Sequence, residues 1–94
     1  MALRRFINVV FEFKDEPDYE SIQATLDKAV DWVRYAPNCW LVWTSTSPQK
    51  WYARLKPHIN DGDHLFICEL NIDMRSGWMP KSFWDFIKSH QPSS

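Results

Sequence analysis

The sequence is poor in glycine and cysteine, with two of each, its net charge is −1, and it has no long apolar run. A net charge this small excludes a protein-wide field that attracts nucleic acid or an anionic membrane, so nucleic-acid binding would need a local basic patch. No stretch approaches the roughly 20 apolar residues of a membrane span, and the N-terminal residues lack an apolar run of signal-peptide length. We therefore expect a cytoplasmic protein that does not associate with membranes.

The two cysteines, Cys39 and Cys68, both lie inside apolar, strand-like runs. A reduced cysteine in such a run behaves as a small hydrophobic residue. A disulfide between them would require their Cβ atoms to face each other at about 4 Å. We expect two buried free thiols, with a disulfide as the alternative, and neither cysteine has a partner at metal-ligand spacing.

Aromatic residues are abundant, with six Trp, six Phe and three Tyr in 94 residues. A chain of this length forms a single domain with a modest core, while each large ring buries on the order of 150 to 250 Å². Some of the rings should therefore lie at an interface with another molecule.

Four segments have the apolar pattern of strands: 3–13, 32–36, 39–45 and 64–71. In the first, Ile7, Val9 and Phe11 alternate with a mixed set of polar and apolar residues, which predicts one core face. The stretch 39–45 carries apolar side chains on both faces, so it belongs in the middle of the sheet. Pro37 and Asn38 predict a tight turn before it.

Capping residues predict two helices, and a third helical pattern is shorter. Asp18 is placed as the N-cap of a helix that runs to about Asp31. Ser47 and Pro48 begin the second helix, whose inward stripe consists of Trp51, Tyr52, Leu55 and Ile59. Gly62 is expected in a left-handed turn after it, and residues 80–88 have a short helical pattern.

This order of elements predicts an α+β domain, the ferredoxin-like βαββαβ sandwich, with the first and third strands at the centre of an antiparallel sheet. Two helices would cover one face, and a short helix would follow at the C-terminus. Apolar side chains would then remain on the opposite face, and a contiguous apolar patch marks an interaction surface. We therefore expect a homodimer, formed sheet against sheet or through the C-terminal segment, whose interface contains Phe6, Val10, Trp40, Val42 and Phe66.

The runs WVRYAPNCWLV (32–42), TSTS (44–47), LKPHINDGDHLFI (55–67) and GW (77–78) resemble the small SinR-type proteins. These are similar in fold to the CRISPR-associated spacer-acquisition subunit, a ferredoxin-like homodimer described in some members as a metal-dependent nuclease. The resemblance implies a dimeric protein of nucleic-acid metabolism or defence. A homodimeric interaction protein without nuclease activity is the alternative.

The resemblance also implies one candidate catalytic residue. In the CRISPR-associated relatives a carboxylate at the end of the first strand faces the dimer partner, where two copies hold a divalent metal. Glu12 stands at that place, after Phe11, where the relatives have Tyr-Asp. Glu12 is therefore the candidate catalytic and metal residue, with Mg²⁺ or Mn²⁺ as the cofactor. The simpler interpretation is a solvated carboxylate at a strand end.

Four cations are the candidate nucleic-acid contacts, as a modest patch along one edge: Arg4, Arg5, Lys14 and Arg34. The alternative is an ordinary solvated surface. RNA-recognition domains share this order of elements and stack bases on sheet aromatics, but the basic-Gly-aromatic motif of those domains is absent from 39–45. His58 and His64 flank the turn that contains Gly62, where surface roles are expected.

Overall fold

The computed structural model describes residues 3–90 as a mixed α+β chain. Its elements are β1 (Arg5–Glu12), α1 (Tyr19–Leu26), β2 (Asp31–Ala36), β3 (Cys39–Thr44), α2 (Pro48–Leu55), the short 3₁₀ helix η1 (Lys56–His58), β4 (His64–Leu70) and α3 (Lys81–His90). The four predicted strands and the three predicted helical segments are therefore confirmed, with shifts at their ends.

The four strands form one antiparallel sheet in the order β2-β3-β1-β4. β1 and β3 lie at the centre, as predicted from the order of elements and, for β3, from its two apolar faces. Val9 of β1 is opposite Trp40 of β3 on one side and opposite Ile67 of β4 on the other. Because residues directly opposite each other project to the same face, this register decides which side chains share a face.

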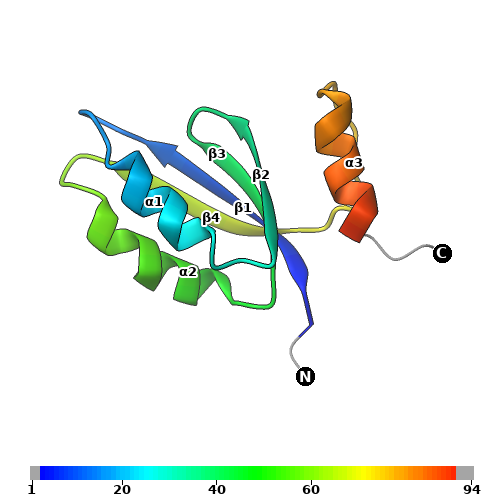
Figure 1. Cartoon of the computed structure of the whole chain (residues 1–94), viewed down its shortest axis with the longest axis horizontal. Coiled ribbons are helices and arrows are strands. Elements are labelled where there is room, and N and C mark those ends of the chain that lie inside the picture. Colours follow the sequence, from blue (N-terminus) through cyan, green and yellow to red (C-terminus); the bar gives the residue numbers. More distant parts are fainter. Residues whose placement is uncertain (1–2, 91–94) are drawn as a thin grey trace.

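One face of the sheet, called here the helix face, is covered by α1 and α2 (Figure 1). Apolar side chains from the strands and from both helices pack there into the main core. Its fully or almost fully buried members are Ile7, Val9, Phe11, Ile22, Leu26, Trp40, Val42, Trp51 and Leu55.

The other face, called here the opposite face, is partly covered by α3, which lies on the far side of the sheet from α1 and α2 (Figure 1). A second, smaller core forms there around Phe6, Leu41 and Ile87, which are at most 4% exposed. Residues 72–90 therefore include a helix that packs on its own chain, against β2, β3 and part of β1.

The predicted dimer interface needs correction at three residues. Trp40 and Val42 lie on the helix face and are 1% and 0% exposed, because their positions opposite Val9 and Ile7 turn them toward α1 and α2. Phe6 does lie on the opposite face, but α3 buries it to 4% exposure. None of the three is available to a second molecule in this structure.

α1 begins where predicted and ends earlier than predicted. The carboxylate of Asp18 caps the helix by accepting from the backbone N–H and the hydroxyl of Ser21, and these two hydrogen bonds lower the pKa of Asp18. The predicted end near Asp31 is wrong, since α1 stops at Leu26. Asp27 instead accepts from the indole N–H of Trp32 at 3.0 Å, which ties the helix end to the start of β2.

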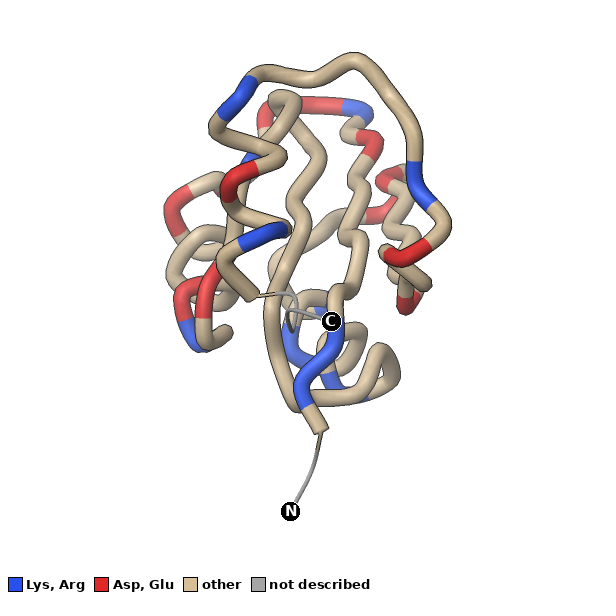
Figure 2. The backbone as a smooth tube through the Cα atoms, turned by 90° about the vertical axis from the view of Figure 1, so that its right-hand side faces the viewer, with Lys and Arg blue, Asp and Glu red and all other residues tan. Residues whose placement is uncertain are grey.

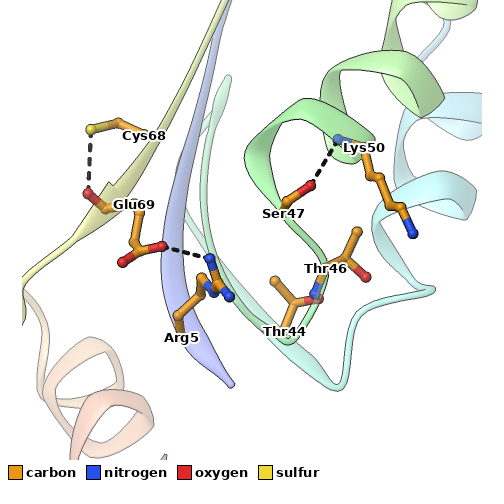
Figure 3. Close-up of polar contacts among 7 residues, drawn as sticks. All are labelled: Arg5, Thr44, Thr46, Ser47, Lys50, Cys68 and Glu69. Atoms are coloured by element: carbon orange, nitrogen blue, oxygen red, sulfur yellow. Dashed lines mark hydrogen bonds and ion pairs between the residues drawn. The ribbon is translucent and has the colours of Figure 1, made fainter. Parts of the chain in front are cut away.

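α2 also begins as predicted, with the Ser47 hydroxyl accepting from the backbone N–H of Lys50 (Figure 3). Trp51 and Leu55 are buried, whereas Tyr52 of the predicted inward stripe is 49% exposed. Gly62 has a φ of +92°, which confirms its left-handed conformation.

The remaining expectations concern the thiols and membranes. Cys39 and Cys68 are free, as expected, but each is half-buried rather than buried. Across residues 3–90, no helix is both long enough and apolar enough to cross a membrane.

Candidate functional site

The most exposed apolar part of the sheet is a strip along β1 and β4 on the opposite face, which α3 does not cover. Phe66 is 63% exposed, Leu70 is 37% exposed, and Val10 and Cys68 are half-buried. We call these four residues the open strip. In Figure 2, which looks from the α3 side, α3 and the segment 71–80 surround strands that carry few charges.

The segment that follows β4 adds two exposed apolar side chains to this side of the molecule. Met74 is 85% exposed and Trp78 is 99% exposed. The segment is held next to α3, because Gly77 lies against the ring of Trp84 and the indole N–H of Trp84 donates to the carbonyl of Met79 at 3.2 Å. A fully exposed indole on an anchored segment is a candidate contact for another molecule.

Glu12, the candidate catalytic residue, lies at the end of β1 on the same face as the open strip. Its side chain is 80% exposed, and Oε1 is 3.2 Å from Nδ1 of His64, the residue directly opposite on β4. Two such exposed groups interact weakly in water. Sequence patterns did not reveal this pairing, which follows from the register of β1 and β4.

The surroundings of Glu12 contain one other potential metal ligand, His64. Among residues 3–90, no group of three or more His, Cys, Asp or Glu side chains is arranged to hold a metal. Mg²⁺ prefers oxygen ligands and usually takes one or two carboxylates. Glu12 supplies one carboxylate beside the imidazole of His64.

A polar pair lies between the open strip and α3. The phenol O–H of Tyr35, on β2, reaches across β3 to donate to the side-chain oxygen of Asn8 on β1. Burial raises the pKa of Tyr35, whose ring also packs edge-on against Phe83 of α3. The phenol therefore stays neutral and links the sheet to the first turn of α3.

The end of α3 is linked to the sheet by His90. Nε2 of His90 lies 2.7 Å from Oδ2 of Asp31, and its ring stacks on Trp43 with centroids 5.2 Å apart. Sequence reasoning missed this contact because it placed the third helix by periodicity alone. A His in the last turn of an amphipathic helix was the available signal, but its partner lies 59 positions away in the sequence.

The four candidate nucleic-acid cations do not form one patch. Arg4 and Arg5 lie at the start of β1 and line a hollow of about 270 Å³ that also borders Trp43 and His90. Nη1 of Arg5 pairs with Oε1 of Glu69 at 2.8 Å (Figure 3). Lys14 lies beyond the other end of β1, a strand that spans about 24 Å at the usual rise per residue.

The remaining cations have structural contacts. The Arg34 guanidinium lies over the rings of Tyr19 and Trp40, at 5.0 and 4.7 Å from their centroids, and donates to the carbonyl of Pro37. It therefore supports the β2–β3 turn. The backbone N–H of Lys14, in the loop after β1, donates to Asp63 in the loop before β4. Lys14 therefore lies far from Arg4 and Arg5, and the prediction of one basic edge is wrong.

Comparisons of the chain with protein-family models, with curated proteins and with solved structures find no match.

Proposed function

We propose that this chain is a homodimeric interaction protein whose two copies meet through the open strip. The exposure of Phe66 carries the proposal, since this ring lies on a sheet face whose other half is closed by α3. Exposed apolar groups that lie together on a face are typical of interaction sites. Met74 and Trp78, on the segment that follows β4, are also exposed, and the proposed contact includes them.

The area that a stable interface buries supports the inclusion of the segment 71–80 in the dimer contact. A stable interface buries about 800 Å² on each partner, and the four residues of the open strip cannot supply that area alone. Each large ring contributes on the order of 150 to 250 Å². Together, Phe66 and Trp78 would form the aromatic centre that interfaces commonly contain.

We also propose that the fold is the ferredoxin-like class, in the cytoplasm, and that the chain is related to the SinR-type proteins that it resembles. The order β2-β3-β1-β4 supports this class, because α1 and α2 each connect strands and lie on the same face. The free thiols of Cys39 and Cys68 support a reducing compartment.

Light scattering coupled to size-exclusion chromatography tests the dimer. We expect the wild-type chain to have a dimer's mass at micromolar concentration and Phe66→Asp to have a monomer's mass, since a buried carboxylate at the interface is unfavourable. Val30→Asp is the matched control, because Val30 is 50% exposed and lies away from the open strip. A monomeric wild-type protein, or a dimeric Phe66→Asp, refutes the proposal.

A second candidate function is a divalent-metal-dependent nuclease that uses Glu12 from both copies. The position of Glu12 on the opposite face favours it, since a dimer formed through the open strip brings this face of each copy toward the other. The Glu12 of the partner copy would then supply a second oxygen donor. His64, beside it, could orient the carboxylate.

Incubation with single- and double-stranded RNA and DNA, with Mg²⁺ or Mn²⁺, tests the nuclease. We expect cleavage by the wild type, loss of cleavage in Glu12→Gln, and unchanged cleavage in Glu16→Gln, an exposed carboxylate in the loop after β1. Cleavage that persists in Glu12→Gln, or no cleavage by the wild type, rejects this function and leaves the interaction protein.

A further inference from the structure

β4 is an outer strand of the sheet and lacks the usual protection of an edge. It pairs with β1 without a shift from His64 to Leu70 and contains no Lys, Pro or Gly. On β2, the other outer strand, the register shifts between Arg34 and Ala36. Register shifts and residues such as Lys and Pro hinder the addition of another strand. β4 is therefore the edge that can accept a further strand.

Apolar side chains are exposed on both sides of this edge. Phe66, which projects to the opposite face, is 63% exposed. Beside β4 and α2 there is a groove of about 410 Å³, lined by Pro48, Gln49, Tyr52, Leu65, Phe66 and Ile67. Phe66 belongs both to the open strip and to this lining. The apolar surface therefore continues around the edge of β4, from one face of the sheet to the other.

This surface fits a second copy of β4. The residues that line the groove are uncharged. Lys50 of α2 points away from β4 (Figure 3), and the Arg54 guanidinium lies over the ring of Trp51, 5.1 Å from its centroid. A strand that covers the edge therefore needs apolar side chains on both of its own faces and no charge between them. The stretch 65–68 of β4, Leu-Phe-Ile-Cys, has this pattern, and Phe66 is already part of the proposed dimer contact.

The side chains of β4 also select a register for two antiparallel copies related by a twofold axis. A pairing centred on Phe66 gives these opposite pairs: Phe66 with Phe66, Leu65 with Ile67, and His64 with Cys68. Moving the centre by one residue in either direction places a carboxylate, that of Glu69 or Asp63, opposite an apolar side chain, which is unfavourable. With Phe66 at the centre both carboxylates lie beyond the paired stretch 64–68. There Arg5 pairs with Glu69 at 2.8 Å, and backbone N–H groups donate to Asp63.

We propose that the two copies of the dimer join along β4, so that their four-stranded sheets form one continuous sheet. The inference rests on the proposed function and specifies its contact, in which the open strips lie side by side. Backbone groups on the free side of β4 pair with those of the second copy, whose Leu65 and Ile67 enter the groove against Tyr52. Each Glu12 lies on β1, one strand away from the junction. The nuclease needs the other arrangement, in which the open strips meet face to face.

Cross-linking of the full chain tests this pairing. In the proposed register, residue 64 of one copy lies directly opposite residue 68 of the other, within reach of a disulfide, whereas within one chain the two positions are about 13 Å apart. The variant is His64→Cys in a Cys39→Ser background, which keeps Cys68. With oxidised glutathione as the oxidant, we expect a covalent dimer on a non-reducing gel. Adding Cys68→Ser should abolish it.

Glu12→Cys in the same background is the matched control. The side chains of Glu12 and His64 are 80% and 75% exposed, but position 12 lies one strand farther from the second copy, roughly 10 Å from its Cys68. We expect about tenfold less covalent dimer from it, or none. Circular dichroism checks that the variants fold. Hydrogen exchange of the wild type needs no variant: the amides of 64–68 that do not pair with β1 should exchange about tenfold more slowly, or slower still, in the dimer than in dilute monomer.

Light scattering under reducing conditions separates the two ways in which the inference can fail. A monomer refutes the proposed function, and the edge pairing with it. A dimer without the cross-link in His64→Cys, with an equal cross-link in Glu12→Cys, or without slower exchange in β4, overturns the edge pairing alone. A dominant cross-link in Glu12→Cys would show that the open strips meet face to face.

Discussion

The two faces of the same sheet are covered in different ways. On the helix face, α1 and α2 each connect two strands, so both ends of each helix are held by the sheet. On the opposite face, α3 is attached only through the segment 71–80, and its last turn is held by the His90–Asp31 contact. The first arrangement closes its face, and the second leaves the open strip.

Simple dimensions explain this difference. Strands lie about 4.8 Å apart, so four strands are wider than the roughly 10 Å diameter of one helix. Two helices cover the width of the sheet, whereas one helix covers about half of it. α3 lies over the β2 and β3 half, and the exposed Phe66 lies on the other half. The number of covering helices therefore explains why one face has an apolar surface left for a partner.

The largest expected effect is on the helix face. Trp40→Ala should lower the free energy of unfolding by about 3 to 5 kcal/mol, because the change leaves a large cavity at a side chain that is 1% exposed. It also removes the ring under the Arg34 guanidinium. Urea denaturation followed by circular dichroism measures the change.

Trp78→Ala is the control, since the same side chain is removed at a position that is 99% exposed. At a protein concentration low enough for the chain to be monomeric, we expect its unfolding free energy to stay within about 0.5 kcal/mol of the wild type. Similar losses of unfolding free energy in Trp40→Ala and Trp78→Ala would mean that the two positions contribute equally to stability despite their different exposure.

The next largest loss of stability is expected in α3, which covers part of the opposite face. Ile87→Ala removes a fully buried side chain of α3 and should cost about 2 kcal/mol, near the low end for such changes, because α3 packs on the smaller of the two cores and can detach locally. Amide hydrogen exchange should then become faster in residues 81–90 and stay unchanged in α1 and α2.

Equal acceleration in all three helices would contradict this expectation. It would show that α3 unfolds together with the main core as one unit, and that the two faces differ in coverage but not in stability.

Local sequence signals predicted the elements well because their causes are local. Asp18 and Ser47 cap helices through side chains that reach three residues along the chain. Gly62 adopts its left-handed conformation without reference to distant residues. The strands were recognised from alternation, the central place of β3 from apolar side chains on both faces, and that of β1 from the usual strand order of the predicted fold.

Assignments that depend on long-range pairing were less successful. Apolar side chains on both faces of 39–45 do not show which face receives the helices, so Trp40 and Val42 were placed at an interface although they lie in the main core. The basic residues were grouped by sequence, whereas β1 separates Arg5 from Lys14.

A smaller effect is expected at the contact that holds the end of α3. His90→Ala should cost about 1 kcal/mol, since it removes one hydrogen bond to Asp31 and the stacking on Trp43. A double-mutant cycle with Asp31→Ala separates the two contributions, and a coupling close to zero would assign the whole effect to stacking. His58→Ala, in η1, serves as a control at the other face.

The smallest effect is a pH dependence in the loop before β4. The backbone N–H groups of Lys14 and Asn60 both donate to Asp63, and these hydrogen bonds hold the pKa of its carboxyl below the ordinary value of 3.8. Asp63 therefore stabilises the fold above that value, and the contribution is lost as the pH falls through the lower pKa of the folded state.

Asp63→Asn should make the unfolding midpoint in urea less dependent on pH in the acid range than in the wild type. Asp61→Asn is the control in the same loop. An NMR titration of the Asp63 carboxyl carbon that gives a pKa at or above the ordinary value of 3.8 would contradict the assignment.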